Sequence, residues 1–159
     1  MIKLIPTKQQ IKEAEKLFDF GKLNNSVTKG KGNLAGALGE ILVRDAYNGK
    51  QENTFDYDLI LNNKKVDVKT KRFSNMQTPT AKWNASVLAF NINQKCDWYC
   101  FVGVSNDYKV SYIYGFKEKD DFYKEATFGK KDEIDPNGSG NNWTFREDTY
   151  YLSIKNLIL

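Results

Sequence analysis

Hydrophobic residues recur at helical spacing in two segments near the N-terminus. Between Thr7 and Gly21 they recur every three or four positions, and these two residues suit the helix start and stop. The stretch 33–49 has the same period, with Asn33 as a candidate N-cap and Asn48-Gly49 at the end. The lysine-, glycine- and asparagine-rich residues between them predict a loop. We therefore expect two amphipathic helices joined by a long loop.

From Thr54 the hydrophobic period changes to two, which is typical of strands. The segments FDYDLIL and KKVDVKT flank Asn62-Asn63, a dipeptide that tolerates positive φ and suits a tight hairpin turn. Three more runs read as strands: SVLAFNI, DWYCFVGVS and KVSYIYGF, with a turn at Asn106-Asp107 before the last.

The C-terminal third adds less regular elements. KEKDDFYKEA predicts a short helix, DEIDPNGSGNN a loop, and TYYLSIKNLIL a strand or a mixture of strand and helix. The whole pattern predicts the α+β class with a largely antiparallel sheet, built as a single domain over residues 1–159.

Composition and charge indicate where the protein acts and what kind of partner it could bind. No apolar run approaches the roughly 18 residues of a membrane span. The N-terminus MIKLIPTKQQ is too short and polar for a signal peptide. We therefore expect a cytoplasmic protein with no membrane association. The net charge of +4 is compatible with a polyanionic partner.

The sequence contains no histidine, which removes several chemistries. Serine or cysteine nucleophiles activated by histidine, histidine-ligated zinc and histidine acid–base catalysis are all excluded. Cys96 and Cys100 are read as core residues rather than zinc ligands, because a zinc site needs about four ligands. Acid–base or metal chemistry must therefore use Asp, Glu, Lys and water.

The expected hairpin places like charges opposite each other. With Asn62-Asn63 as the loop, Leu59 faces Val66 and Asp58 faces Asp67. Alternation then predicts a polar face and an apolar, core-facing side. The polar face holds Asp56, Asp58, Asp67 and Lys69, and the apolar side holds Tyr57, Leu59, Val66 and Val68.

Opposed carboxylates destabilise a sheet unless something compensates. A divalent cation would do so, since Mg²⁺ takes oxygen ligands at about 2.1 Å and is often bound by one or two carboxylates. The alternative is a solvent-exposed face in which Asp56 and Lys69 form an ion pair while Asp58 and Asp67 are simply solvated. A longer turn would make Asp56 the partner of Asp67 instead.

These residues resemble the PD-(D/E)xK nuclease superfamily, which includes type II restriction endonucleases. The likeness rests on Asp58, then Asp67-Val68-Lys69 on the adjacent strand, after a helix carrying Glu40. It covers about residues 33–104. It implies a restriction-endonuclease-like α-β-β-β-α-β core, with a mixed, largely antiparallel sheet flanked by helices. Tyr57 stands where the motif has proline.

The resemblance also implies roles. Asp58 and Asp67 would be metal ligands with the Val68 carbonyl beside them, Lys69 the catalytic lysine, and Glu40 a further ligand, direct or through water. The implied cofactor is Mg²⁺, with Mn²⁺ able to substitute. Glu40 alternatively reads as an exposed residue at the edge of its helix's apolar stripe.

The expected function is therefore metal-dependent hydrolysis of DNA phosphodiester bonds. Three basic residues are candidates for nucleic-acid contact: Lys71, Arg72 and Lys82. The alternative is a catalytically inactive module on the same fold that binds nucleic acid or protein. A homodimer is compatible with the resemblance, since restriction enzymes that cut both strands are commonly dimers.

Overall fold

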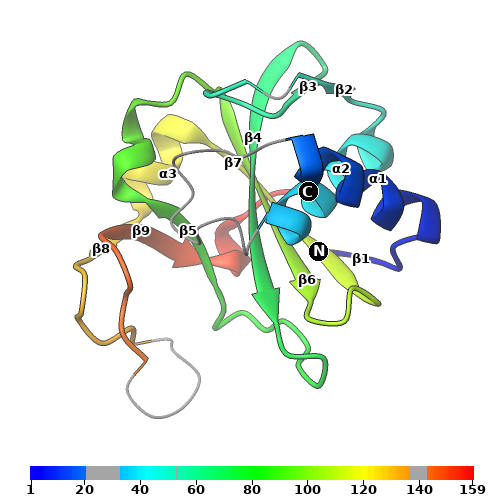
Figure 1. Cartoon of the computed structure of the whole chain (residues 1–159). Helices are drawn as coiled ribbons and strands as arrows, with labels where there is room; N and C mark the ends of the chain where they lie inside the picture. Colours follow the sequence, from blue (N-terminus) through cyan, green and yellow to red (C-terminus); the bar gives the residue numbers. More distant parts are fainter. Residues whose placement is uncertain (21–32, 53, 137–142) are drawn as a thin grey trace.

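A computed structural model of the chain describes residues 1–20, 33–52, 54–136 and 143–159 (Figure 1). The helices are α1 (Lys8–Phe20), α2 (Asn33–Tyr47) and α3 (Lys119–Glu125), with 3₁₀ turns η1 (Ala89–Asn93) and η2 (Ile154–Asn156). The strands are β1 (Ile2–Leu4), β2 (Lys50–Gln51), β3 (Leu59–Leu61), β4 (Lys64–Phe73), β5 (Asn84–Leu88), β6 (Trp98–Ser105), β7 (Ser111–Glu118), β8 (Thr127–Gly129) and β9 (Thr149–Ser153).

The strands form two sheets. The main sheet has six strands in the order β1-β7-β6-β4-β3-β2, and the second has three in the order β5-β9-β8. Every neighbouring pair is antiparallel except β4 and β6, which run parallel. The predicted α+β class with a mixed, largely antiparallel sheet is therefore confirmed.

The main sheet lies between two hydrophobic clusters. On one face α1 and α2 pack against it, with Leu38 and Ile41 of α2 fully buried beside Val66 and Val68. On the other face the second sheet and α3 cover an aromatic cluster that includes Tyr99. Figure 1 shows the helices α1 and α2 on one side of β4 and the β5–β9 layer on the other. The middle of β4, residues 66–68, is thus buried, whereas Lys64, Lys65, Lys71 and Arg72 stay exposed.

The first helix begins with the cap that the sequence predicts. Thr7 Oγ1 accepts from the Gln10 amide at 3.2 Å, and Gln10 Oε1 accepts from the Thr7 amide at 2.9 Å. This reciprocal pair is a capping box, which satisfies donors at the helix start. The predicted stop at Gly21, the predicted loop up to residue 32 and the Asn33 side chain lie outside what the structure describes.

The second helix approaches β4 closely through a glycine. A Cβ on Gly39 would lie 2.1 Å from Thr70 Oγ1, whereas one on Gly36 would meet nothing within 4 Å. Gly39 therefore sets the helix–sheet spacing, and the next residue, Glu40, is held near β4. The helix ends as expected, with Asn48 at φ 51°.

The hairpin register is confirmed. Leu59 pairs with Val66, and the loop residues Asn62 and Asn63 have φ values of 48° and 62°. Positive φ at both central positions is the requirement of the tight hairpin turn that Asn tolerates. The strand before the turn is shorter than expected, because regular pairing begins only at Leu59.

Other expectations hold in part. SVLAFNI divides into β5 and η1, and the C-terminal segment is a strand followed by a 3₁₀ turn. The Asn106-Asp107 turn and the helix α3 are confirmed. The short strands β1, β2 and β8 were not anticipated. Within the described ranges, none of the helices has the length and apolar character that a membrane span needs.

Candidate functional site

Three carboxylates and a lysine converge where α2 meets the β3–β4 hairpin. Glu40 comes from α2, Asp67 and Lys69 from β4, and Asp58 immediately precedes β3. Burial raises the pKa of both Glu40 and Asp58, repulsion from Asp67 adds to the rise, and the charge of Lys69 lowers both. The four side chains that the sequence singled out therefore act on one another electrostatically.

Asp58 continues the hairpin with its side chain. Its backbone N–H donates to the Val66 carbonyl at 3.0 Å, and its Oδ2 accepts from the Val68 amide at 2.7 Å. These two bonds lie on either side of Asp67 along β4. The carboxylate of Asp58 thus satisfies a backbone donor of β4 and is held beside Asp67.

Asp67 is buried, with 5% of its surface exposed, and contacts Lys69. The Lys69 ammonium lies 2.5 Å from Asp67 Oδ2, although the contact lacks hydrogen-bond geometry. It also donates to Gln94 Oε1 at 3.2 Å, while Gln94 Nε2 donates to Asp67 Oδ1 at 3.3 Å. Asp67, Lys69 and Gln94 therefore form a closed polar triangle beneath the aromatic layer.

Glu40 accepts a hydrogen bond from Gln51 of β2, whose Nε2 lies 2.9 Å from Glu40 Oε2. Burial of the carboxylate, together with repulsion from Asp67, raises the pKa of Glu40 from 4.5 to about 7. The hydrogen bond from Gln51 and the charge of Lys69 oppose that shift. Glu40 is thus part of the site rather than an exposed helix residue.

The pKa of Asp58 is raised as well. Burial raises its pKa well above the usual 3.8, and the charges of Glu40 and Asp67 add to the effect. The bond from Val68 and the charge of Lys69 lower it, but do not offset the rise. A buried site with more carboxylates than cations favours either protonation or a bound cation.

The alternative of a solvent-exposed polar face is wrong, because Asp67 is buried. Asp67 and Lys69 alternate with apolar residues as predicted, but their face is covered by the second sheet and α3. Asp56 does not pair with Lys69. Its Oδ1 accepts from the Lys95 amide at 3.0 Å, because the segment before Asp58 turns away from β4. Tyr57 likewise packs with the aromatic cluster instead of with Leu59.

The three expected nucleic-acid contacts are not brought together. Lys71 follows Lys69 on the same strand face, but its ammonium donates to Ser86 Oγ at 2.7 Å and to the Asn84 carbonyl at 3.2 Å. Arg72 points to the opposite face, 5.9 Å from the Tyr108 ring centroid. Lys82 lies exposed in the turn before β5. Their contact with nucleic acid stays a prediction.

Sequence reasoning missed the two glutamines, Gln94 and Gln51. Neither lies in the Asp58–Lys69 motif, and both reach the site through pairings that the hairpin does not reveal. A polar residue directly after the apolar run that forms η1 is a weak signal for Gln94. Nothing in the spacing indicates Gln51.

The carboxylate oxygens of Glu40, Asp58 and Asp67 are the type of ligand that a hard divalent cation prefers. In the described part of the chain, no group of three or more carboxylate or thiol side chains is close enough to hold a metal ion as it stands. Asp67 Oδ2 is buried, and its ion-pair partner Lys69, 2.5 Å away, does not meet it with hydrogen-bond geometry. An oxygen so placed, beside Asp58 and Glu40, fits the carboxylate chemistry of Mg²⁺.

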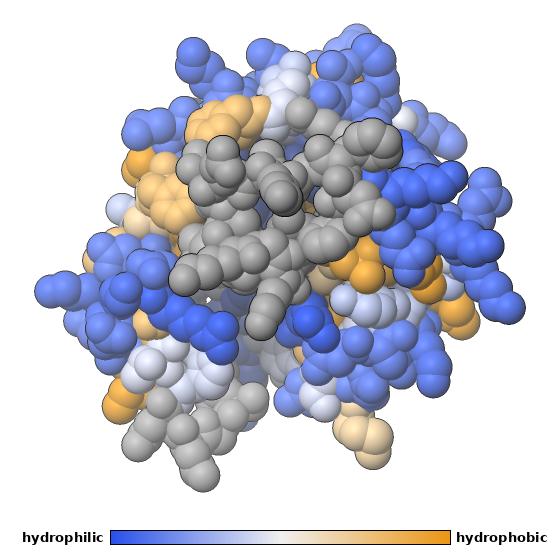
Figure 2. All heavy atoms as spheres, in the orientation of Figure 1, coloured by the Kyte–Doolittle hydropathy of each residue, from blue (hydrophilic) through white to orange (hydrophobic). Residues whose placement is uncertain are grey.

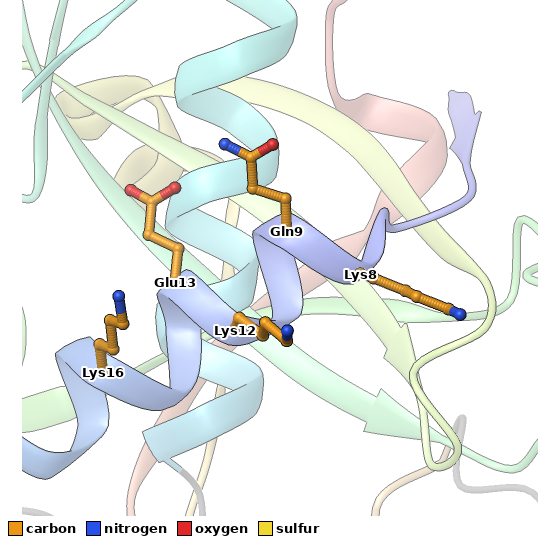
Figure 3. Close-up of a pocket in the computed structure, with 5 residues that line it drawn as sticks. All are labelled: Lys8, Gln9, Lys12, Glu13 and Lys16. Carbon is orange, nitrogen blue, oxygen red and sulfur yellow. The ribbon is translucent and has the colours of Figure 1, made fainter.

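A surface hollow lies elsewhere. Its volume is about 460 Å³, and Figure 3 shows that its lining side chains, Lys8, Gln9, Lys12, Glu13 and Lys16, all come from α1. Glu13 is already paired with Arg44 at 2.5 Å. Figure 2 shows hydrophilic residues over this side of the molecule. The hollow contains none of Glu40, Asp58 and Asp67. The candidate site is therefore identified by its residue types and not by a pocket.

No protein-family model matches the chain, and a comparison with curated proteins finds no significant match. The site must therefore be interpreted from its own residues.

Proposed function

We propose that the protein is a metal-dependent nuclease that hydrolyses DNA phosphodiester bonds, with a PD-(D/E)xK site. The observation that carries the proposal is that Asp58 is held beside Asp67 by its bond to the Val68 amide, with Lys69 in contact with Asp67 and the charge of Glu40 acting on Asp58. Three carboxylates beside a lysine are the ligands and the cation that this reaction uses.

The arrangement of elements supports the proposal. The order α2-β2-β3-β4, followed by a crossover to β6 parallel to β4, is similar to the α-β-β-β portion and the last strand of the α-β-β-β-α-β core. Asp67 and Lys69 lie on β4 and Asp58 lies just before β3, which supports the proposal. One feature departs from that core, because the crossover carries β5 and η1 where the family has its second helix.

In this proposal Asp58, Asp67 and Glu40 hold the cation together with the Val68 carbonyl. Bound Mg²⁺ or Mn²⁺ supplies positive charge at the phosphate. Hydrolysis joins a water oxygen to phosphorus and breaks the bond to the leaving sugar oxygen, which takes up a proton. Lys69 stabilises the negative charge that develops on the phosphate, or orients the attacking water.

The test is cleavage of supercoiled plasmid and single-stranded DNA in Mg²⁺ or Mn²⁺, with EDTA as a control. We expect wild-type protein to cut, and Asp67→Ala and Lys69→Ala to be inactive. The matched control is Asp120→Ala, because Asp120 is an exposed carboxylate on α3 outside the site. It should cut as wild type does.

Calorimetric titration with Mn²⁺ separates the alternatives. Metal binding that Asp67→Ala abolishes, without cleavage of either DNA, would retain the site but reject these substrates. Neither binding nor cleavage by wild type would overturn the nuclease and favour the non-catalytic module.

A further inference from the structure

Gln94 contacts both members of the ion pair between Asp67 and Lys69. It follows η1 and is 9% exposed, so its side chain lies inside the molecule. Its Oε1 accepts from the Lys69 ammonium at 3.2 Å, and its Nε2 donates to Asp67 Oδ1 at 3.3 Å and to the Phe55 carbonyl at 3.4 Å. The amide thus links the pair to the segment that precedes Asp58.

The orientation of this amide is fixed by chemistry. An ammonium can only donate, and a carboxylate or carbonyl can only accept. The amide oxygen must therefore face Lys69 and the amide nitrogen must face Asp67 and Phe55. Glutamate could not donate to Asp67, and lysine could not accept from Lys69, so among long side chains an amide meets both demands.

The backbone of Gln94 is also held in place. Its N–H donates to the Asn91 carbonyl at 3.0 Å, and its own carbonyl accepts from the Lys119 ammonium. Lys119 begins α3 and Asn91 lies in η1, so two separate elements hold the backbone of Gln94. A side chain anchored in this way can hold its partners to a narrow geometry.

We infer that Gln94 is a positioning residue that keeps the Lys69 ammonium at the site once a cation takes over the Asp67 carboxylate. This inference rests on the proposed function. A cation bound by Asp67 competes with Lys69 for the same oxygen. The Lys69 ammonium then keeps its hydrogen bond to Gln94 and a weaker contact with the Tyr99 ring, whose centroid lies 5.7 Å away. Without that bond the ammonium would move away from the phosphate, and a displacement of about 1 Å is worth roughly 100-fold in rate.

The test compares Gln94→Met with wild type, because methionine keeps the length and volume of the side chain without its polar ends. We expect kcat for plasmid cleavage to fall about 10- to 100-fold while KM changes less than about threefold. The Mn²⁺ dissociation constant from calorimetry should stay within about threefold, because the carboxylates remain. Gln77→Met is the matched control, since Gln77 is exposed in the turn after β4.

Gln94→Glu sharpens the experiment. It keeps an acceptor for Lys69 but removes the donor toward Asp67 and adds a carboxylate. We expect it to recover part of the kcat that Gln94→Met loses, and to bind Mn²⁺ more tightly than wild type. A loss of folding in either variant would show as a changed circular dichroism spectrum.

Three results would overturn the inference. Equal kcat for wild type and a folded Gln94→Met would remove the role and leave the nuclease standing. Loss of Mn²⁺ binding in Gln94→Met would make Gln94 a support of the metal ligands rather than of Lys69. Failure of wild type to cut any DNA would reject the proposed function, and this role with it.

Discussion

Two lysines stand two residues apart on the same face of β4, yet their surroundings differ completely. Lys69 lies 2.5 Å from a buried carboxylate oxygen and within hydrogen-bond distance of Gln94. Lys71 donates to the hydroxyl of Ser86 and to a backbone carbonyl of β5. One lysine belongs to a cluster of negative charge, and the other belongs to a contact between the two sheets.

The difference has an electrostatic consequence at Lys71. Lys71 is exposed as a residue, but its ammonium is directed to β5 by the bonds to Ser86 and Asn84. Removal from water lowers the pKa of Lys71 from 10.5 to about 8, and the charge of Asp135 opposes this only in part. Residue type and strand face are thus shared by the two lysines, and the environment alone separates their roles.

The largest expected effect comes from exchanging each lysine for methionine. Lys69→Met should lower kcat for DNA cleavage by roughly 100- to 1,000-fold, the scale for losing one charge-stabilising group in an active site. Lys71→Met should lower it by less than about tenfold, because its ammonium already serves Ser86. Steady-state kinetics on both variants measure this contrast.

Salt dependence provides the control for this comparison. If Lys71 contacts a DNA phosphate as the sequence suggests, Lys71→Met would weaken binding and reduce the slope of log K against log salt by about one. An unchanged slope would assign Lys71 to the contact between the sheets. Equal losses of kcat in the two variants would contradict the contrast itself.

A smaller effect is expected from Glu40→Gln, which removes one carboxylate from the surroundings of Lys69. The pKa of Glu40 is raised from 4.5 to about 7, so the folded state keeps a proton that the unfolded chain has lost between these pH values. The free energy of unfolding of metal-free wild type should therefore fall as pH rises from 4.5 to 7. The variant should show a smaller fall, because Asp58 still contributes one, and should be more stable at pH 8 by up to about 3 kcal/mol.

Urea denaturation in EDTA across pH 4.5 to 8 measures this difference, with the exposed Glu15→Gln on α1 as control. Parallel pH profiles for wild type and Glu40→Gln would refute it. In Mg²⁺ the order at pH 8 should reverse, because glutamine cannot supply a negatively charged ligand.

The hairpin side of the site could be predicted from the sequence because its geometry is local. Asn62-Asn63 determines the turn, and the turn determines that Asp58 lies beside Asp67. Glu40 followed from helical periodicity together with the family resemblance. Each of these inferences spans few residues or uses a repeating pattern.

The rest depends on contacts between distant segments. The second sheet and α3 cover the face of Asp67, and the crossover from β4 to β6 delivers Gln94. Lys71 is bound by β5, 13 and 15 residues further along the chain. Periodicity indicates which face of a strand is polar, but it cannot indicate that a second sheet will enclose that face.

The smallest expected effect tests how Glu40 is placed near Lys69 while Lys71 is left untouched. A Cβ on Gly39 would lie 2.1 Å from Thr70 Oγ1 and 3.2 Å from Thr70 Cβ, so Gly39→Ala must push α2 away from β4. Overpacking costs typically 1–3 kcal/mol, and the better helix propensity of alanine returns at most about 1 kcal/mol. Gly39→Ala should therefore lower the free energy of unfolding by about 1–2 kcal/mol.

Gly36 offers the matched control on the same helix. A Cβ there would meet nothing within 4 Å, so Gly36→Ala should raise the free energy of unfolding by up to about 1 kcal/mol. Urea denaturation gives both values, and Mn²⁺ calorimetry should show weaker binding only for Gly39→Ala, because that change displaces Glu40. If the two alanines shift stability in the same direction, the close approach of Gly39 to Thr70 does not set the distance between Glu40 and the carboxylates of the hairpin.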